Sequence, residues 1–233
     1  LLAVSIVGFI AFCLMSAGLK VLKPQEALVL TLFGDYIGTL KGEGFYYVHP
    51  FASAVNPAAN TKLNQSGDVK SKTVQVNAEG VTVSAEPASK RMSLKIMTLN
   101  NNRQKINDCL GNPIEIGIAV TWRIVDTAKA AFNVDNYKEF LSLQCDTALR
   151  NIVRVYPYDV APNVDTTGDG VADDGSLRGS SDLVAKRIRD EIQSRVEEAG
   201  LEIIEARITY LAYAPEIAAA MLQRPQAAAI IDA

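Results

Sequence analysis

The sequence predicts an α+β fold in which antiparallel strands are followed by packed helices, with an apolar segment before this domain and an alanine-rich helix after it. Three observations predict this order. Residues 1–19 carry no charged side chain, short glycine-punctuated runs of β-branched and aromatic residues follow from residue 26, and the apolar period becomes helical after residue 126. A length of 233 residues suffices for one or two domains.

The composition excludes several classes of protein. A formal net charge of -3, from 23 basic and 26 acidic residues, is not typical of a nucleic-acid-binding protein. The 3 cysteines form no CxxC pair, and His49 is the single histidine, so we expect neither a disulfide framework nor a zinc site. The motifs of serine hydrolases, phosphate loops, dinucleotide-binding folds and zinc peptidases are missing from the sequence. We therefore expect a protein without catalytic residues or a cofactor.

The first residues, LLAVSIVGFIAFCLMSAGL, predict a transmembrane anchor over residues 1–22. As a helix, residues 1–19 would measure about 28 Å, close to the thickness of the hydrocarbon layer. A secretory signal, whose apolar region is usually about 7 to 15 residues long, and a buried core helix are the alternatives. The residues expected to contact lipid are Leu1, Leu2, Val4, Ile6, Val7, Phe9, Ile10, Phe12, Leu14 and Leu19.

The residues that follow the anchor predict its orientation. Lys20 and Lys23 favour a cytoplasmic location for the rest of the chain. Phe45, Tyr46 and Tyr47 are amphipathic rings, which favour the membrane interface, although an ordinary core strand is the alternative. The chain begins within the apolar run and without methionine, so we expect a truncated end; a preceding apolar segment would turn a single-pass anchor into a hairpin.

The strands are predicted from alternating apolar and polar residues and from the glycine-containing turns between them. EALVLTLFG, DYIGTLKGEG and FYYVHPF are three β-type runs separated by glycine, and residues 56–90 predict an exposed insertion with a hairpin around NAEG. Isoleucine, valine and tryptophan alternate with small or polar residues over residues 114–124, which predicts a long strand with one face in the core. Residues 93–108 supply one or two partner strands, and GNP supplies the turn.

The helices are predicted from caps and apolar stripes. Asp126 can cap a helix that opens with TAKAAFNV, and an apolar stripe continues helically until YPYD. A second helix over residues 182–199 should turn Leu183, Ile188, Ile192 and Val196 inward and stop at Gly200. LEIIEARITYLAY then predicts a strand, and an alanine-rich helix follows with a proline in its first turn.

These segments together resemble a known family. LKPQEALVLTLFGDYIGTLKGEGFYYVHPF resembles the opening of the SPFH domain, also called the band 7 or prohibitin-homology domain. GNPIEIGIAVTWRIVDTAKAAFNVDNY is similar to the family's central strand and following helix, and residues 177–229 resemble its C-terminal half, which runs into a coiled coil. The stomatin-like or slipin-like bacterial branch is the most similar. The resemblance implies an anchor at residues 1–22, an SPFH domain at 23–213 with insertions near 56–90 and 162–175, and the start of an oligomerisation helix at 214–233.

The resemblance also implies a function. Family members are membrane-anchored, non-enzymatic scaffolds that assemble into rings or cages and organise a membrane patch, so the implied partners are membrane lipid, further copies of the chain, and a membrane protease or other membrane proteins. A regulatory adaptor of a membrane protease in a hetero-complex is the alternative. Pro225 stands where the family usually has glutamine, so we expect a kink or break near residues 221–224.

One further stretch, DTTGDGVADDGS, resembles a calcium loop. Asp165, Asp169 and Asp173 would occupy positions 1, 5 and 9 of an EF-type loop. Thr167 and Ser176 occupy positions 3 and 12, where acidic ligands are usual. We therefore expect a solvated turn without metal, with an exported calcium-binding module as the alternative.

Overall fold

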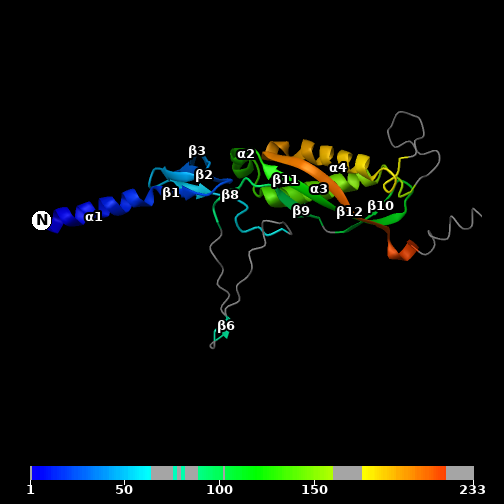
Figure 1. The fold of residues 1–233 in the computed structure, drawn as a ribbon, viewed down its shortest axis with the longest axis horizontal. Coiled ribbons are helices and arrows are strands. Elements are labelled where there is room, and N and C mark those ends of the chain that lie inside the picture. The colour runs from blue at the N-terminus through cyan, green and yellow to red at the C-terminus, as the bar shows by residue number, and fades with distance from the viewer. Residues whose placement is uncertain are drawn as a thin grey trace, which may run out of the picture.

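The computed structural model describes residues 2–63, 76–77, 80–81, 89–101, 103–159 and 175–218. The molecule is elongated (Figure 1). Helix α1 (Leu2–Ala17) extends from one end, the N-terminal sheets come next, and a central sheet with its helices follows. Residues 215–218, a helical turn drawn in orange, lie at the end opposite α1.

The fold confirms the expected mixture of antiparallel strands and packed helices. The N-terminal strands are β1 (Leu19–Leu22), β2 (Glu26–Leu32), β3 (Asp35–Lys41), β4 (Gly44–Tyr47), β5 (Ser53–Val55), β6 (Val76–Asn77), β7 (Gly80–Val81) and β8 (Met92–Ser93). The central elements are β9 (Met97–Asn100), β10 (Gln104–Asn107), β11 (Pro113–Ile124), α2 (Thr127–Phe132), α3 (Tyr137–Val153), α4 (Ser181–Val196), the 3₁₀ turn η1 (Glu197–Ala199) and β12 (Leu201–Tyr213).

Helix α1 forms most of the segment expected to be a membrane anchor. It is 16 residues long and ends at Ala17, and residues 19–22, which we included in the anchor, form strand β1 instead. Within the described ranges, the structure contains no helix that is both long enough and apolar enough to cross a bilayer.

Apart from the short β6–β7 hairpin, the described strands of the N-terminal region form two sheets. β1 pairs with β4, and β2 lies between β3 and β5 and also pairs with β8, all antiparallel. β2 is buried on both faces: Leu28 and Leu30 pack with Leu22 in a small cluster, whereas Val29 belongs to the core of the central region. The strands expected at the start of the domain are thus confirmed, and β2 joins the two regions.

The central sheet is built around β11. β12 pairs with one edge of β11 along its whole length, from Ile114↔Tyr213 to Ile124↔Leu201, and β9 and β10 pair with the other edge. The alternation predicted for this strand is confirmed, because Ile118 and Trp122 and the other apolar residues of the set are buried. The helices lie between β11 and β12 in sequence, so the last strand returns to the middle of the domain.

Asp126 caps α2 as predicted, and a second cap, which was not predicted, begins α3. The Asp126 carboxylate accepts hydrogen bonds from the backbone N–H groups of residues 128 and 129 at the start of α2. The stretch expected to continue helically is divided, because Asn136 caps a new helix, α3, by accepting from the Glu139 N–H. α3 and α4 pack against each other and on the face of β11 that carries the core side chains.

Helix α4 corrects one predicted core residue. Leu183 is 48% exposed, and Val184 is buried in its place with Ile188, Ile192 and Val196. Residues four apart lie on the same face of a helix, whereas residue 183 is five positions from residue 188 and points about 100° away from residue 184. Gly200 stops the helical segment as predicted, in the left-handed conformation with φ 68°.

Some expectations fall partly outside the described residues. The hairpin around NAEG is confirmed at its centre, where β6 pairs with β7. Pro215 is the first residue of a helical turn that is described to residue 218. The expected kink before Pro225 and the rest of the oligomerisation helix lie beyond the described part of the chain.

Candidate membrane-contact surface

Four apolar side chains of β1 and β4 share one exposed face. Leu19 lies opposite Tyr47, and Val21 lies opposite Phe45. Directly opposed residues of an antiparallel pair point to the same side of the sheet, and all four side chains are exposed, Phe45 by 84%. We call these four residues the β1–β4 face. Two of the predicted interface residues, Phe45 and Tyr47, therefore lie together on it.

The opposite side of the same strand pair faces the protein. Lys20 lies opposite Tyr46, and Leu22 is buried in the small cluster of the N-terminal sheets. Tyr46 packs against that cluster, and its hydroxyl donates to the Lys41 carbonyl at 3.1 Å. Tyr46 is thus a partly buried packing residue, unlike the two rings that flank it in sequence.

A second aromatic pair lies at the turn between β2 and β3. Phe33 is 87% exposed and has φ 53°, and Gly34 follows with φ 103°. Positive φ at both central residues is the type I′ pattern, for which asparagine–glycine is usual and phenylalanine is unfavourable. The Phe33 ring stacks on Phe51 with 6.4 Å between the centroids, and His49 lies 5.6 Å from Phe51. The fold therefore holds a large apolar ring in solvent despite a backbone cost.

Gly18 connects α1 to these strands. The Val48 N–H donates to the Gly18 carbonyl at 2.9 Å, and the Gly18 N–H donates to the Met15 carbonyl at 3.2 Å. A Cβ atom at position 18 would lie 2.4 Å from the Val48 oxygen, so no other residue fits without displacement. The end of α1 is thereby fixed against the end of β4.

The predicted anchor residues with described side chains are exposed. They are Ile6, Phe9, Phe12 and Leu19, and Met15 is exposed beside them. The side chains of the remaining predicted anchor residues lie outside what the structure describes, and these are Leu1, Leu2, Val4, Val7, Ile10 and Leu14.

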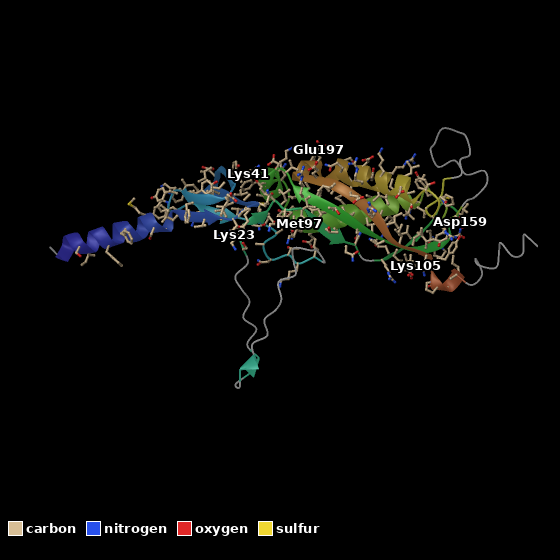
Figure 2. The ribbon with its side chains drawn as sticks, viewed as in Figure 1. Lys23, Lys41, Met97, Lys105, Asp159 and Glu197 are labelled. Atoms are coloured by element: carbon tan, nitrogen blue, oxygen red, sulfur yellow. The ribbon has the colours of Figure 1, made fainter. Side chains whose placement is uncertain are left out.

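The two predicted interface lysines have different partners. The Lys20 ammonium donates to the Ala17 carbonyl at 3.2 Å, a favourable place for a cation because the C-terminus of a helix carries partial negative charge. Lys23 is exposed, and its backbone N–H donates to Glu26 Oε2 at 3.3 Å. In Figure 2, Lys23 and Lys41 lie in the N-terminal region, while Lys105 and Asp159 lie at the opposite end of the molecule.

The calcium-loop prediction falls almost entirely outside the described residues, since Asp165, Asp169 and Asp173 are not described. Ser176, the last residue of that stretch, is fully buried, and its Oγ accepts a hydrogen bond from the Gly179 N–H at 2.9 Å. In the ranges that are described, no three His, Cys, Asp or Glu side chains gather as a metal site would require.

Two cysteines differ in environment. Cys145 is buried on α3, and burial, with a smaller contribution from the Asp146 carboxylate, raises the pKa of its thiol to about 12. Cys109 is exposed, and partial burial and the nearby Asp108 carboxylate also raise the pKa of its thiol. Both thiols therefore stay protonated at neutral pH, which is typical of thiols without a catalytic role.

Sequence reasoning found the rings of β4 but missed their partners. Val21 was placed inside the anchor, and Phe33 and Phe51 were not singled out. The sequence holds a short signal for Val21, since residues 19–21 alternate apolar, charged and apolar. The pairing with residues 44–47 crosses more than twenty positions and has no local signature.

The comparisons with known proteins agree with this architecture. A search of curated proteins finds no significant match. The model of the family described as SPFH domain / Band 7 matches residues 20–233, which include β1 from its second residue, strands β2 to β12 and all described helices after α1. The match begins next to the end of α1 and covers far more than half of the chain, and on that basis the chain belongs to the SPFH domain / Band 7 family.

Proposed function

We propose that this chain is a membrane-associated scaffold that rests on lipid through α1 and the β1–β4 face and assembles with further copies of itself. The observation that carries the proposal is the gathering of exposed apolar side chains at one end of the molecule. Phe45 and Tyr47 lie exposed on strands joined to α1, and α1 exposes Phe9 and Phe12. Contiguous exposed apolar surface of this kind marks contact with a membrane or a protein.

Three features favour a membrane as the contact. The exposed side chains include aromatic rings, which prefer the interface between headgroups and acyl chains. α1 carries no charged residue. Lys20 and Lys23 directly follow α1, where cations favour the cytoplasmic leaflet, so we place the central sheet on the cytoplasmic side. The proposal requires only that α1 contacts the apolar layer.

Self-assembly is the second part of the proposal. Residues 215–218 leave the central sheet as a helical turn at the end opposite α1 and its membrane-contact surface (Figure 1). Long helices at that position are the implied means of ring or cage assembly in the family. The proposal assigns no chemical reaction to the chain, and it treats a membrane protease as a client of the assembly.

Vesicle flotation tests the membrane part. The full chain should float with phosphatidylcholine vesicles, and the Phe45→Ser/Tyr47→Ser variant should partition at least about a hundredfold less, because two fully buried rings at roughly 1.5–3 kcal/mol each contribute about 3–6 kcal/mol. Leu183→Ser is the matched control, since Leu183 is an exposed apolar residue on α4 and its loss should leave flotation unchanged. Equal flotation of all three proteins would contradict the proposed surface.

Sizing tests the assembly part. After detergent-free extraction, light scattering should give a mass many times that of one chain. A monomer would contradict self-assembly, and a particle that always contains a near-stoichiometric protease would favour the adaptor hypothesis.

A further inference from the structure

An open groove of about 360 Å³ lies beside β1. Residues of three strands border it: Leu19 and Val21 on β1, and the apolar residues Leu28 on β2 and Ala54 on β5. We call this feature the β1 groove. Its volume is at the lower end of the range of roughly 300–1,000 Å³ that is usual for small-molecule sites. The groove can therefore hold a headgroup and the first carbons of a chain, but no large ligand.

Three cations line the same groove. They are Lys20, Lys90 and Arg91, and the acidic partner that the structure shows there is Glu26, whose Oε2 lies 3.3 Å from Arg91 Nη1. Among the described residues at the groove, three positive charges against one negative charge leave an excess of two. An ammonium has three donors and a guanidinium has five, so Lys20 and Arg91 can keep their present bonds to Ala17 and Glu26 and still bind an anion.

The basic wall of the groove is held in place by hydrogen bonds. The Asn56 amide donates to the Ser89 carbonyl at 3.3 Å and to the Arg91 carbonyl at 3.0 Å. The Arg91 N–H donates to Ser89 Oγ at 3.3 Å, and the following residue, Met92, pairs with β2. The backbone that carries Lys90 and Arg91 is thus preorganised, which lowers the entropy cost of binding an anion.

We propose that the β1 groove binds the anionic headgroup of a membrane phospholipid. The phosphate would lie among Lys20, Lys90 and Arg91, and the glycerol and first methylene groups would lie on the apolar lining. A lipid suits this position because β1 borders the groove and also carries Leu19 and Val21, whose side chains are exposed on the adjoining β1–β4 face. The inference rests on the proposed membrane contact and adds a preference for one class of lipid.

Flotation with two vesicle types tests the groove. The full chain should partition more strongly into vesicles that contain phosphatidylglycerol than into pure phosphatidylcholine. Lys20→Gln/Lys90→Gln should lower partitioning into the anionic vesicles about fivefold for each cation removed, and should leave binding to neutral vesicles unchanged. Arg150→Gln/Lys186→Gln, which removes two exposed cations from α3 and α4, should change partitioning less than twofold.

The outcomes separate the two proposals. Binding to neither vesicle type overturns the membrane contact itself. Equal binding to both types, or equal losses in the two double variants, overturns the groove and leaves the membrane contact standing. A photoreactive phosphatidylglycerol should label the peptide that contains residues 89–91, and labelling elsewhere would contradict the site. Protection of that peptide by millimolar inorganic phosphate alone would show a site for free phosphate instead of lipid.

Discussion

The N-terminal sheets and the central sheet use apolar side chains in opposite ways. In the central region the isoleucines of β11, together with Trp122, are buried against α3 and α4 in one large core. In the N-terminal region the independent core is the cluster of Leu22, Leu28 and Leu30, while large rings such as Phe45 are exposed. The difference indicates that the large core, to which Val29 and Met92 also contribute, stabilises most of the fold. The proposed function gives the exposed rings of the N-terminal region a contact outside the chain.

Core truncation in the two regions should give the largest effects and the clearest contrast. Trp122→Ala should lower the free energy of unfolding by about 3–5 kcal/mol, because it empties a fully buried site in the large core. Leu28→Ala should cost about 2–3 kcal/mol, because a small cluster near the surface collapses more readily. Urea unfolding followed by circular dichroism measures both. A larger loss for Leu28→Ala would reverse the assignment of the main core.

One glycine substitution in each region should give a smaller loss of stability than the core truncations. Gly200→Ala should destabilise by about 2–3 kcal/mol, because φ is 68° and the added Cβ would lie 2.3 Å from the Asp126 carbonyl oxygen. Gly34→Ala should cost about 1–2 kcal/mol, because φ is 103° but the space around the added Cβ is open. Thermal unfolding measures both variants. If the two variants lost equal stability, the cost at position 200 would come from backbone strain alone, without a contribution from the close contact with Asp126.

Ionisation of the Cys145 thiol has the smallest expected effect on stability, because it changes the free energy of unfolding only at alkaline pH. Because the pKa of Cys145 is raised from 9.0 to about 12 on folding, its contribution to stability is complete below pH 9 and is lost as the pH rises towards 12. Between pH 9 and 10.5 the unfolding free energy of wild type should therefore fall more steeply than that of Cys145→Ala, by up to about 1.4 kcal/mol per pH unit.

Labelling provides the control for that comparison. At neutral pH a maleimide should modify the exposed Cys109 and spare Cys145 until the chain is unfolded. Parallel pH dependence in wild type and Cys145→Ala, or rapid labelling of Cys145, would contradict the buried environment.

Much of the central region was predictable from local patterns. The alternating residues of β11 mark their own buried face, and Asp126 and Gly200 mark helix ends, because caps and left-handed stops have local chemical causes. The prediction that Leu183 is buried was wrong, although the four-residue spacing of Val184, Ile188 and Ile192 already indicated that Val184 faces the core. The family is confirmed, while the stomatin-like branch and the metal-free turn expected at residues 165–176 stay predictions.

The membrane-contact surface was predictable only in part. Phe45 and Tyr47 were found from their residue type, but the β1 groove brings Lys20 beside Lys90 and Arg91 from about seventy positions away. That proximity follows from the pairing of β2 with β8 and from the Asn56 amide bonds, and neither has a periodic signature. Non-local strand pairing is the part of a fold that local sequence specifies least.

The junction at Gly18 has a mechanical consequence. One residue separates the end of α1 from the start of β1, and its carbonyl accepts a hydrogen bond from the Val48 N–H at a position too tight for any side chain. Such a joint transmits torque instead of absorbing it. If a bilayer sets the tilt of α1, it also sets the angle at which the whole elongated body stands, and neighbouring copies would then present their far ends at one common height.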